Sequence, residues 1–270
     1  MTPRNRHRSA FPVMGTIASV RIASQVDGGR ALASIAACQE SLKADERRFS
    51  HFARDSEISR RLRGEAIPAC AEREIDDVLE GCHRLEIESG GVFKATNPTT
   101  GAVDTAGFVK GYSMGKAAER MRALGVHDFV FSVGGDTVCA GSPDERRPWR
   151  VAVADPRAPN PVAAILEMRD AAVATSGTAE RGQHIWCFGK PVRSPLLSFT
   201  VTGPDILAAD AYATIGFAMG EAGIEWVTDH AGYSSIALGL DGSLRGDAQL
   251  VRGSSRVRGF ESTHTGVRAG

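Results

Sequence analysis

The segment over residues 104–112 combines a carboxylate and an ammonium group, Asp104 and Lys110, six residues apart across a turn of small residues. Glycines at positions 107 and 111 have no Cβ atom, so a ligand can approach the backbone closely. Lys110 is expected at the N-terminal end of an amphipathic helix, where free N–H groups and the helix dipole favour anions. The pattern predicts a phosphate-bearing ligand with one end held by Asp104. A turn with a surface salt bridge is the alternative that this segment leaves open.

Other irregular segments lie where expected strands or helices begin or end. They are Met14-Gly15-Thr16, Gly134-Gly135-Asp136, Thr175-Ser176-Gly177-Thr178 with His184 seven residues after Gly177, and Ala209-Asp210-Ala211-Tyr212-Ala213-Thr214. In order and spacing, the whole set resembles the ApbE family, the FAD:protein FMN transferases. The resemblance runs from about residue 11 to about residue 220, and a weaker part covers residues 232–242. Its specificity lies in the set, because short glycine-rich motifs are individually weak.

The resemblance implies FAD as substrate and transfer of its FMN part to a Ser or Thr hydroxyl of an acceptor protein, with release of AMP. The residues that would contact FAD occupy the matching motif positions: Met14, Gly15, Asp104, Lys110, Gly134, Gly135, Ser176 and Gly177. Transfer of this kind needs positioning and charge neutralisation more than a covalent contribution from the enzyme. That requirement agrees with a chain in which no nucleophile–base pair stands out.

A magnesium site is expected beside the flavin motifs. Asp210 and Thr214 are four residues apart on a predicted helix, so they share one face. Carboxylate, hydroxyl and carbonyl oxygens suit Mg²⁺, which also accepts substrate phosphate oxygens. The resemblance implies a third ligand, the backbone carbonyl three residues after Asp104, which is that of Gly107. A dipole-stabilised carboxylate and a back-bonded hydroxyl are the structural alternative for the helical pair.

His184 is the candidate acid/base or phosphate contact, because imidazole titrates near working pH; a structural histidine is the alternative. The chain departs from the family directly after it. Relatives continue with a hydrophobic pair, Asp-Pro and Thr-Gly, whereas this chain lacks the Asp-Pro and has Phe188 where Thr is expected. This departure keeps open an FAD pyrophosphatase, in which water replaces the acceptor hydroxyl. A non-catalytic flavin-binding protein is the third possibility, and the intact metal motif argues against it.

The composition is that of a soluble globular protein, with 270 residues, 42% hydrophobic and 24% charged. Lys+Arg and Asp+Glu both count 32, so no net field indicates a nucleic-acid partner. The sequence shows no membrane span, signal-peptide core or lipobox, so a cytoplasmic location is expected unless a leader has been removed. The five cysteines form no CxxC pair, and Cys38 and Cys82 are expected as buried core residues.

Helices and strands do not alternate strictly, so the prediction is an α+β fold rather than a doubly wound one. Helices are expected over residues 30–49, 72–88, 111–124 and 207–219, with a short one ending at Leu62; strands are expected over 16–23, 128–133, 137–140, 149–154, 163–168, 171–174, 197–202 and 234–240. The resemblance specifies one ApbE-like (T-fold-like) domain over residues 11–251, with a mixed or antiparallel sheet and packed helices. Residues 1–10 are expected as a basic tail and residues 252–270 as a disordered one.

Overall fold

The computed structural model describes residues 7–23, 25–97, 99–144, 147–155, 157, 162–177, 186–187, 190–191, 194–247 and 250. Its helices are α1 (Gly28–Phe49), α2 (Glu57–Leu62), α3 (Ala69–Glu88), α4 (Ala106–Ala123), α5 (Ile206–Met219) and α6 (Ala222–Thr228). Its strands are β1 (His7–Val13), β2 (Thr16–Ile22), β3 (Phe129–Val133), β4 (Asp136–Ala140), β5 (Trp149–Ala154), β6 (Val162–Met168), β7 (Ala171–Gly177), β8 (Trp186–Cys187), β9 (Lys190–Pro191), β10 (Leu196–Gly203), β11 (Ser234–Gly239) and β12 (Leu244–Gly246).

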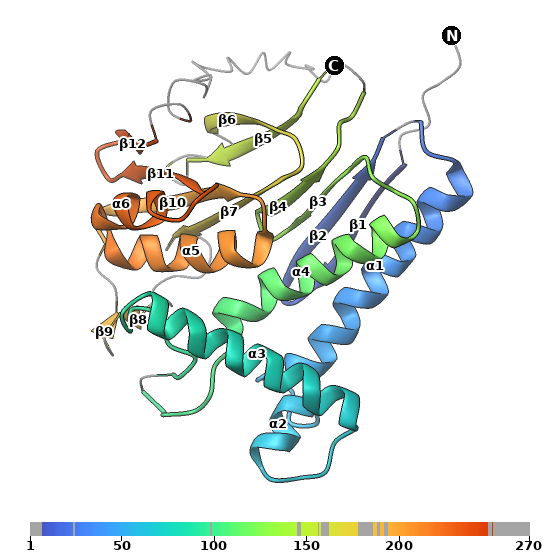
Figure 1. Ribbon diagram of the computed structural model, residues 1–270, viewed down its shortest axis with the longest axis vertical. Helices are drawn as coiled ribbons and strands as arrows, with labels where there is room; N and C mark the ends of the chain where they lie inside the picture. The colour runs from blue at the N-terminus through green and yellow to red at the C-terminus, as the bar shows by residue number, and fades with distance from the viewer. Residues whose placement is uncertain are drawn as a thin grey trace, which may run out of the picture.

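Eight strands form one antiparallel sheet in the order β1-β2-β3-β4-β7-β10-β11-β12. Helices α1, α4 and α5 cross one face of this sheet, while α3 and α2 lie further out (Figure 1). The main hydrophobic core lies between these helices and the sheet. The fold is therefore α+β, as predicted.

The β5–β6 hairpin covers the other face of the sheet. Strand β5 alternates buried and exposed residues from Trp149 to Ala154, which is the pattern of a strand with one face in a core. Its inward side chains pack with Cys139 of β4 and Val173 of β7 in a second hydrophobic cluster. This hairpin lies between β4 and β7 in sequence, so these two neighbouring strands of the sheet are joined by a connection over its face.

Helix α5 is central to the site because nearly all of its faces are buried. Asp205 begins the helix, and its side chain accepts a hydrogen bond from the Ala208 N–H at 2.9 Å. The sequence that follows is apolar all round, as expected for a helix packed on several sides. Asp210, 3% exposed, is an exception to that apolar character, so its charge needs partners within the protein.

Five elements were not expected from the sequence: β1, β8, β9, α6 and β12. Strand β1 begins at His7 and pairs with β2, so the last four residues of the expected tail over 1–10 belong to the sheet. The sequence pattern did not predict β1 because Pro12 argues against a strand in the interior of a sheet. Strand β1 lies at the edge of the sheet, where a proline is tolerated. The expected disordered tail over residues 252–270 lies outside the described residues. Cys38 and Cys82 are buried, as predicted.

Candidate functional site

Two β-hairpin tips lie side by side at one end of the sheet. Met14 and Gly15 join β1 to β2 with φ angles of 53° and 71°, and Gly134 and Gly135 join β3 to β4 with φ angles of 54° and 95°. Two successive positive φ values are those of a type I′ turn, whose twist matches antiparallel strands. The Gly134 N–H donates to the Ile17 carbonyl at 3.2 Å, so the two tips are bonded together. These glycines therefore serve the two turns.

The first tip is also tied to the helical layer. The Met14 N–H donates to Oε1 of Glu46 on α1 at 2.7 Å. An open groove of about 570 Å³ runs beside the tip, and its lining consists of Pro12, Val13, Gly15, Thr16, Ile17 and Glu46. Met14 itself packs partly buried against the core despite its positive φ. A non-glycine residue in this conformation is uncommon, which indicates that its surroundings hold it there.

The start of α4 differs from the prediction. The helix begins at Ala106, so Lys110 lies in its second turn rather than at its entry. Asp104 precedes the helix, and its Oδ1 accepts the Ala106 N–H at 3.0 Å. The carboxylate therefore satisfies one of the free N–H groups at the helix start.

Lys110 lies between two buried carboxylates. Its Nζ is 2.5 Å from Oδ2 of Asp136 and 3.1 Å from Oδ1 of Asp210. Burial lowers the pKa of Lys110, but the Asp210 and Asp136 charges outweigh this effect and raise it well above its usual value. In this structure the ammonium group of Lys110 is therefore paired with these two aspartates and does not form a separate anion-binding site.

The two aspartates are held by backbone groups as well. Oδ1 of Asp136 accepts the Thr175 N–H from β7 at 2.9 Å, and Oδ2 of Asp210 accepts the Gly111 N–H from α4 at 3.0 Å. Burial raises the pKa of Asp210 to about 7; the Lys110 charge opposes this rise and the Asp136 charge adds to it. With both carboxylates ionised, the group of three carries one net negative charge.

Gly111 allows α4 and α5 to approach closely enough for these contacts. A Cβ atom at Gly111 would lie 2.7 Å from Cα of Leu207 and 3.2 Å from Cβ of Asp210. Contacts under 3.0 Å with backbone atoms require a shift of the main chain. The helix crossing therefore depends on the absence of a side chain at this position.

Ser176 and Thr214 meet across β7 and α5. Their hydroxyl oxygens are 3.0 Å apart, and either can be the donor. Gly177 has a structural role next to them, because a Cβ atom there would lie 2.6 Å from the Leu197 carbonyl oxygen of the neighbouring strand. His184 lies outside the described residues.

A Mg²⁺ ion needs oxygen donors. The described residues contain no group of three His, Cys, Asp or Glu side chains that could hold a metal ion. The expected set, Gly107, Asp210 and Thr214, has one carboxylate, one hydroxyl and one carbonyl. Asp210 and Thr214 lie on one face of α5, each already in a polar contact. In a regular helix the Gly111 N–H would donate to the Gly107 carbonyl. Here the same N–H donates to Asp210, so the Gly107 carbonyl oxygen keeps lone-pair capacity for a cation. The donor set thus fits a hard cation.

Sequence reasoning assigned no role to three residues, Asp136, His51 and Phe52. Asp136 was noted beside the two glycines but not assigned, and an acidic residue at the start of an apolar strand was the available signal. His51 and Phe52 lie in the loop between α1 and α2. Nε2 of His51 is 3.0 Å from Oγ1 of Thr105, directly after Asp104, and Phe52 is fully exposed at 102%. No local pattern links residue 51 to residue 105.

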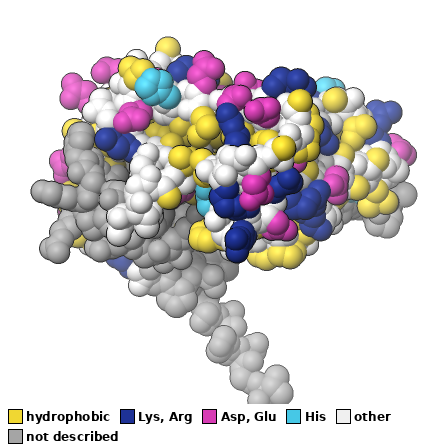
Figure 2. Space-filling model, turned by 90° about the horizontal axis from the view of Figure 1, so that it is seen from below, with side chains coloured by type: hydrophobic (Ala, Val, Ile, Leu, Met, Phe, Trp, Pro, Cys, Tyr) yellow, Lys and Arg dark blue, Asp and Glu magenta, His cyan; other side chains and the backbone are white. Residues whose placement is uncertain are grey.

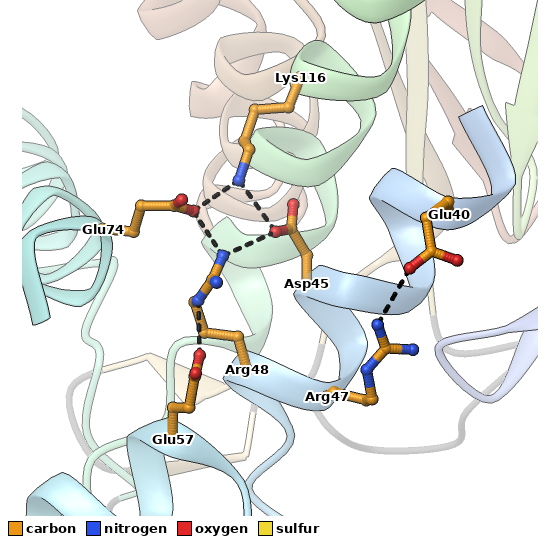
Figure 3. Close-up of polar contacts among 7 residues, drawn as sticks. All are labelled: Glu40, Asp45, Arg47, Arg48, Glu57, Glu74 and Lys116. Atoms are coloured by element: carbon orange, nitrogen blue, oxygen red, sulfur yellow. Dashed lines mark hydrogen bonds and ion pairs between the residues drawn. The ribbon is translucent and has the colours of Figure 1, made fainter. Parts of the chain in front are cut away.

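A charged cluster outside the site connects the four N-terminal helices (Figure 3). Asp45 and Arg48 come from α1, Glu57 from α2, Glu74 from α3 and Lys116 from α4. Nζ of Lys116 lies 2.9 Å from Asp45 and 2.5 Å from Glu74, and Arg48 lies 2.7 Å from Glu57 and 2.8 Å from Glu74. All five residues belong to helices, so this network holds the helical layer together.

The face seen from below carries Lys, Arg, Asp and Glu side chains intermixed with apolar ones (Figure 2). No single sign of charge dominates that view, in agreement with the equal counts of basic and acidic residues in the chain. No helix among the described residues is both long enough and apolar enough to cross a bilayer.

The chain is similar to curated proteins over part of its length. The chain is 32% identical over 123 residues to an FAD:protein FMN transferase of Klebsiella pneumoniae, covering 42% of this chain and 35% of that one. It is 27% identical over 170 residues to the enzyme of the same name from Vibrio cholerae, covering 59% and 50%. The chain thus matches half or less of the length of these curated relatives.

Solved structures share the fold over nearly the whole chain. The ApbE protein of Thermotoga maritima superposes with a TM-score of 0.77 at 19% identity, over 92% of this chain and 99% of that one. The flavin transferase ApbE of Vibrio cholerae gives a TM-score of 0.72 at 19% identity, over the same shares. The family model described as ApbE family matches residues 94–236, which include Asp104, Lys110, Asp136 and Asp210. By this match over more than half of its length, the chain belongs to the ApbE family.

Proposed function

We propose that this protein transfers FMN from FAD to a Ser or Thr hydroxyl of an acceptor protein in a Mg²⁺-dependent reaction that releases AMP. Curated relatives that share part of the chain carry the name FAD:protein FMN transferase. The observation that carries the proposal is the buried group of Asp136, Lys110 and Asp210, where α4, α5 and the β3–β4 tip converge. With both carboxylates ionised, this group carries one net negative charge, which suits a divalent cation.

The flavin substrate would lie across the hairpin tips and the start of α4. The turns at Met14-Gly15 and Gly134-Gly135 would lie along the phosphates of the substrate. Asp104, which caps α4, would hold one end of FAD. Ser176 and Gly177 would border the same space from the end of β7. We assign the exposed ring of Phe52 to stacking on an aromatic ring of FAD.

Asp210, Thr214 and the carbonyl of Gly107 would hold Mg²⁺. When bound, this ion would neutralise charge on the phosphate oxygens of the FAD pyrophosphate. Lys110 would remain beside Asp210 and Asp136, so that the site is not left with two uncompensated carboxylates. Its contribution to FAD binding would then be a positive charge close to the phosphates rather than a dedicated contact.

The reaction balances without a covalent enzyme intermediate. The acceptor hydroxyl oxygen forms a bond to the FMN phosphorus while the bond from that phosphorus to the bridging oxygen breaks. AMP leaves with the bridging oxygen, and the hydroxyl proton passes to a base. His184 is our candidate for this base, since imidazole exchanges protons near neutral pH.

The test compares two aspartates on the same helix. Asp210→Asn should lower Mg²⁺-dependent AMP release more than about a hundredfold, since it removes the charged metal ligand. Asp205→Asn is the matched control, because the Asp205 side chain caps α5 and Asn caps a helix as well as Asp does. Its rate should stay within about twofold of wild type. Full metal-dependent activity of the Asp210 variant would place the metal elsewhere.

The product identifies the reaction. Mass spectrometry of a coexpressed acceptor should show the mass of FMN less one water on a Ser or Thr. If free FMN and AMP form at the same rate with and without the acceptor, the protein is an FAD pyrophosphatase instead.

A further inference from the structure

The N-terminus of α4 is capped from a distant part of the chain. Thr105 occupies the N-cap position, yet its side chain makes no capping hydrogen bond. Instead, the Thr105 N–H donates to Nε2 of His51 at 3.2 Å, and Nε2 also lies 3.0 Å from Oγ1 of Thr105. His51 is 54 residues away, in the loop between α1 and α2.

This contact defines the tautomer of His51. A backbone N–H can only donate, so Nε2 must carry a lone pair and the ring proton must sit on Nδ1. The Thr105 hydroxyl can donate to the same lone pair. A protonated imidazolium would point an N–H of its own at the Thr105 N–H, and the contact would be lost. Burial lowers the pKa of His51, although the Asp104 charge opposes this, so the ring is held in the neutral form that the contact needs.

The loop that carries His51 is itself fixed at both ends. The Ser56 hydroxyl donates to the Ser50 carbonyl at 2.7 Å, which closes the loop across its base. Arg48, just before the loop, is paired at 2.7 Å with Glu57, just after it. His51 is therefore presented to Thr105 by an ordered loop, and the exposed Phe52 is carried by that same loop.

We propose that His51, as the neutral Nδ1–H tautomer, is a positioning residue that holds the Asp104–Thr105 segment and the Phe52 loop in register for FAD. The inference rests on the proposed function, since it assigns FAD to this segment. His51 acts through Thr105 and does not touch the reacting atoms. Asp104, the charged group facing the ring, precedes Thr105 directly, so a shift of Thr105 moves the carboxylate that caps α4.

The experiment measures FAD binding to the full chain at pH 8 and pH 5.5 by flavin fluorescence. His51→Ala should bind FAD about three- to tenfold more weakly than wild type at pH 8, the effect of one lost hydrogen bond. In His51→Gln the amide oxygen sits near the position of Nε2 and accepts at any pH. This variant should keep wild-type affinity at pH 8 and lose affinity at pH 5.5 less than wild type does. His83→Gln is the control, an exposed histidine on α3.

A second measurement does not depend on FAD. Long-range ¹⁵N NMR of the histidine rings should show His51 as the Nδ1–H tautomer at pH 8. An Nε2–H tautomer would overturn this inference and leave the proposed function standing. The same holds if His51→Ala and His51→Gln both bind FAD as wild type does at both pH values. A wild-type protein that binds no FAD at either pH defeats the proposed function, and the assignment of His51 to FAD with it.

Discussion

Adding one methyl group at Gly111 should separate the two helices that form the site. The new Cβ atom of Gly111→Ala would lie 2.7 Å from Cα of Leu207, about 0.7 Å short of an ordinary contact, which begins at 3.4 Å. It would also lie 3.1 Å from the Ile206 carbonyl oxygen. These are backbone atoms, so no side-chain rotation relieves the clash. Lys110 and Asp210, which are on opposite sides of this crossing, must therefore move apart.

The magnitude follows from two opposing effects. Ala in a helix interior is favoured over Gly by about 0.5–1 kcal/mol. Overpacking of a close contact costs about 1–3 kcal/mol, so Gly111→Ala should destabilise the protein by between about zero and about 2.5 kcal/mol. Gly115, one turn later on α4, is the matched control, since a Cβ atom there meets only Cγ2 of Ile206 at 3.7 Å. Gly115→Ala should be stabilised by about 0.5–1 kcal/mol.

Activity should respond more strongly than stability. A shift of about 1 Å in positioned groups can cost about a hundredfold in rate, so Gly111→Ala should release AMP at least about tenfold more slowly, while Gly115→Ala keeps the wild-type rate. Urea unfolding and initial rates of AMP release measure the two effects. If Gly111→Ala is as stable as Gly115→Ala and as active as wild type, the close helix crossing does not position the site.

Two further changes test other parts of the molecule. Lys116→Met should destabilise by about 1–3 kcal/mol, because it removes the closest cation from Asp45, whose side chain is only 1% exposed. Burial raises the pKa of Glu74, but Lys116 and Arg48 outweigh it and lower that pKa, so the associated stabilisation is complete above pH 4.5 and is lost as pH falls through the folded-state value. In urea unfolding from pH 7 to pH 3, Lys116→Met should therefore lose less stability on acidification than wild type; an equal loss would contradict this assignment. Phe52→Ala should leave stability unchanged, because the ring is fully exposed, and weaken FAD binding about two- to tenfold in a fluorescence titration. Unchanged FAD affinity would remove the ring from the flavin site.

Local chemistry explains the parts of the structure that could be predicted. The apolar strands around Phe129–Val133 and Ala171–Gly177, and the amphipathic stretches of α1 and α3, have periods that are visible without any tertiary contact. The glycine pair between β3 and β4 indicates a tight turn for the same reason, since glycine adopts positive φ without strain. The family motifs add the order of these elements.

The predicted position of Lys110 illustrates where local reasoning failed. A helix beginning near Gly111 would place this ammonium at free N–H groups, as an anion ligand. The helix instead begins at Ala106, because Asp104 satisfies the Ala106 N–H and His51 the Thr105 N–H. Lys110 consequently faces Asp136 and Asp210, which are 26 and 100 residues further along the chain.

The sequence by itself determined the kinds of element, the glycine turns and the membership in a family whose members share these motifs. Periodicity, turn chemistry and motif order are properties of neighbouring residues, and they need no knowledge of what lies across the core. Only the tertiary structure decided which charges are paired. Asp136, Lys110 and Asp210 meet because the β3–β4 tip, α4 and α5 converge, and His51 reaches Thr105 because a loop after α1 folds against the start of α4. Such contacts depend on the close packing of elements distant in sequence, where the absence of one methyl group at Gly111 sets the distance between two helices.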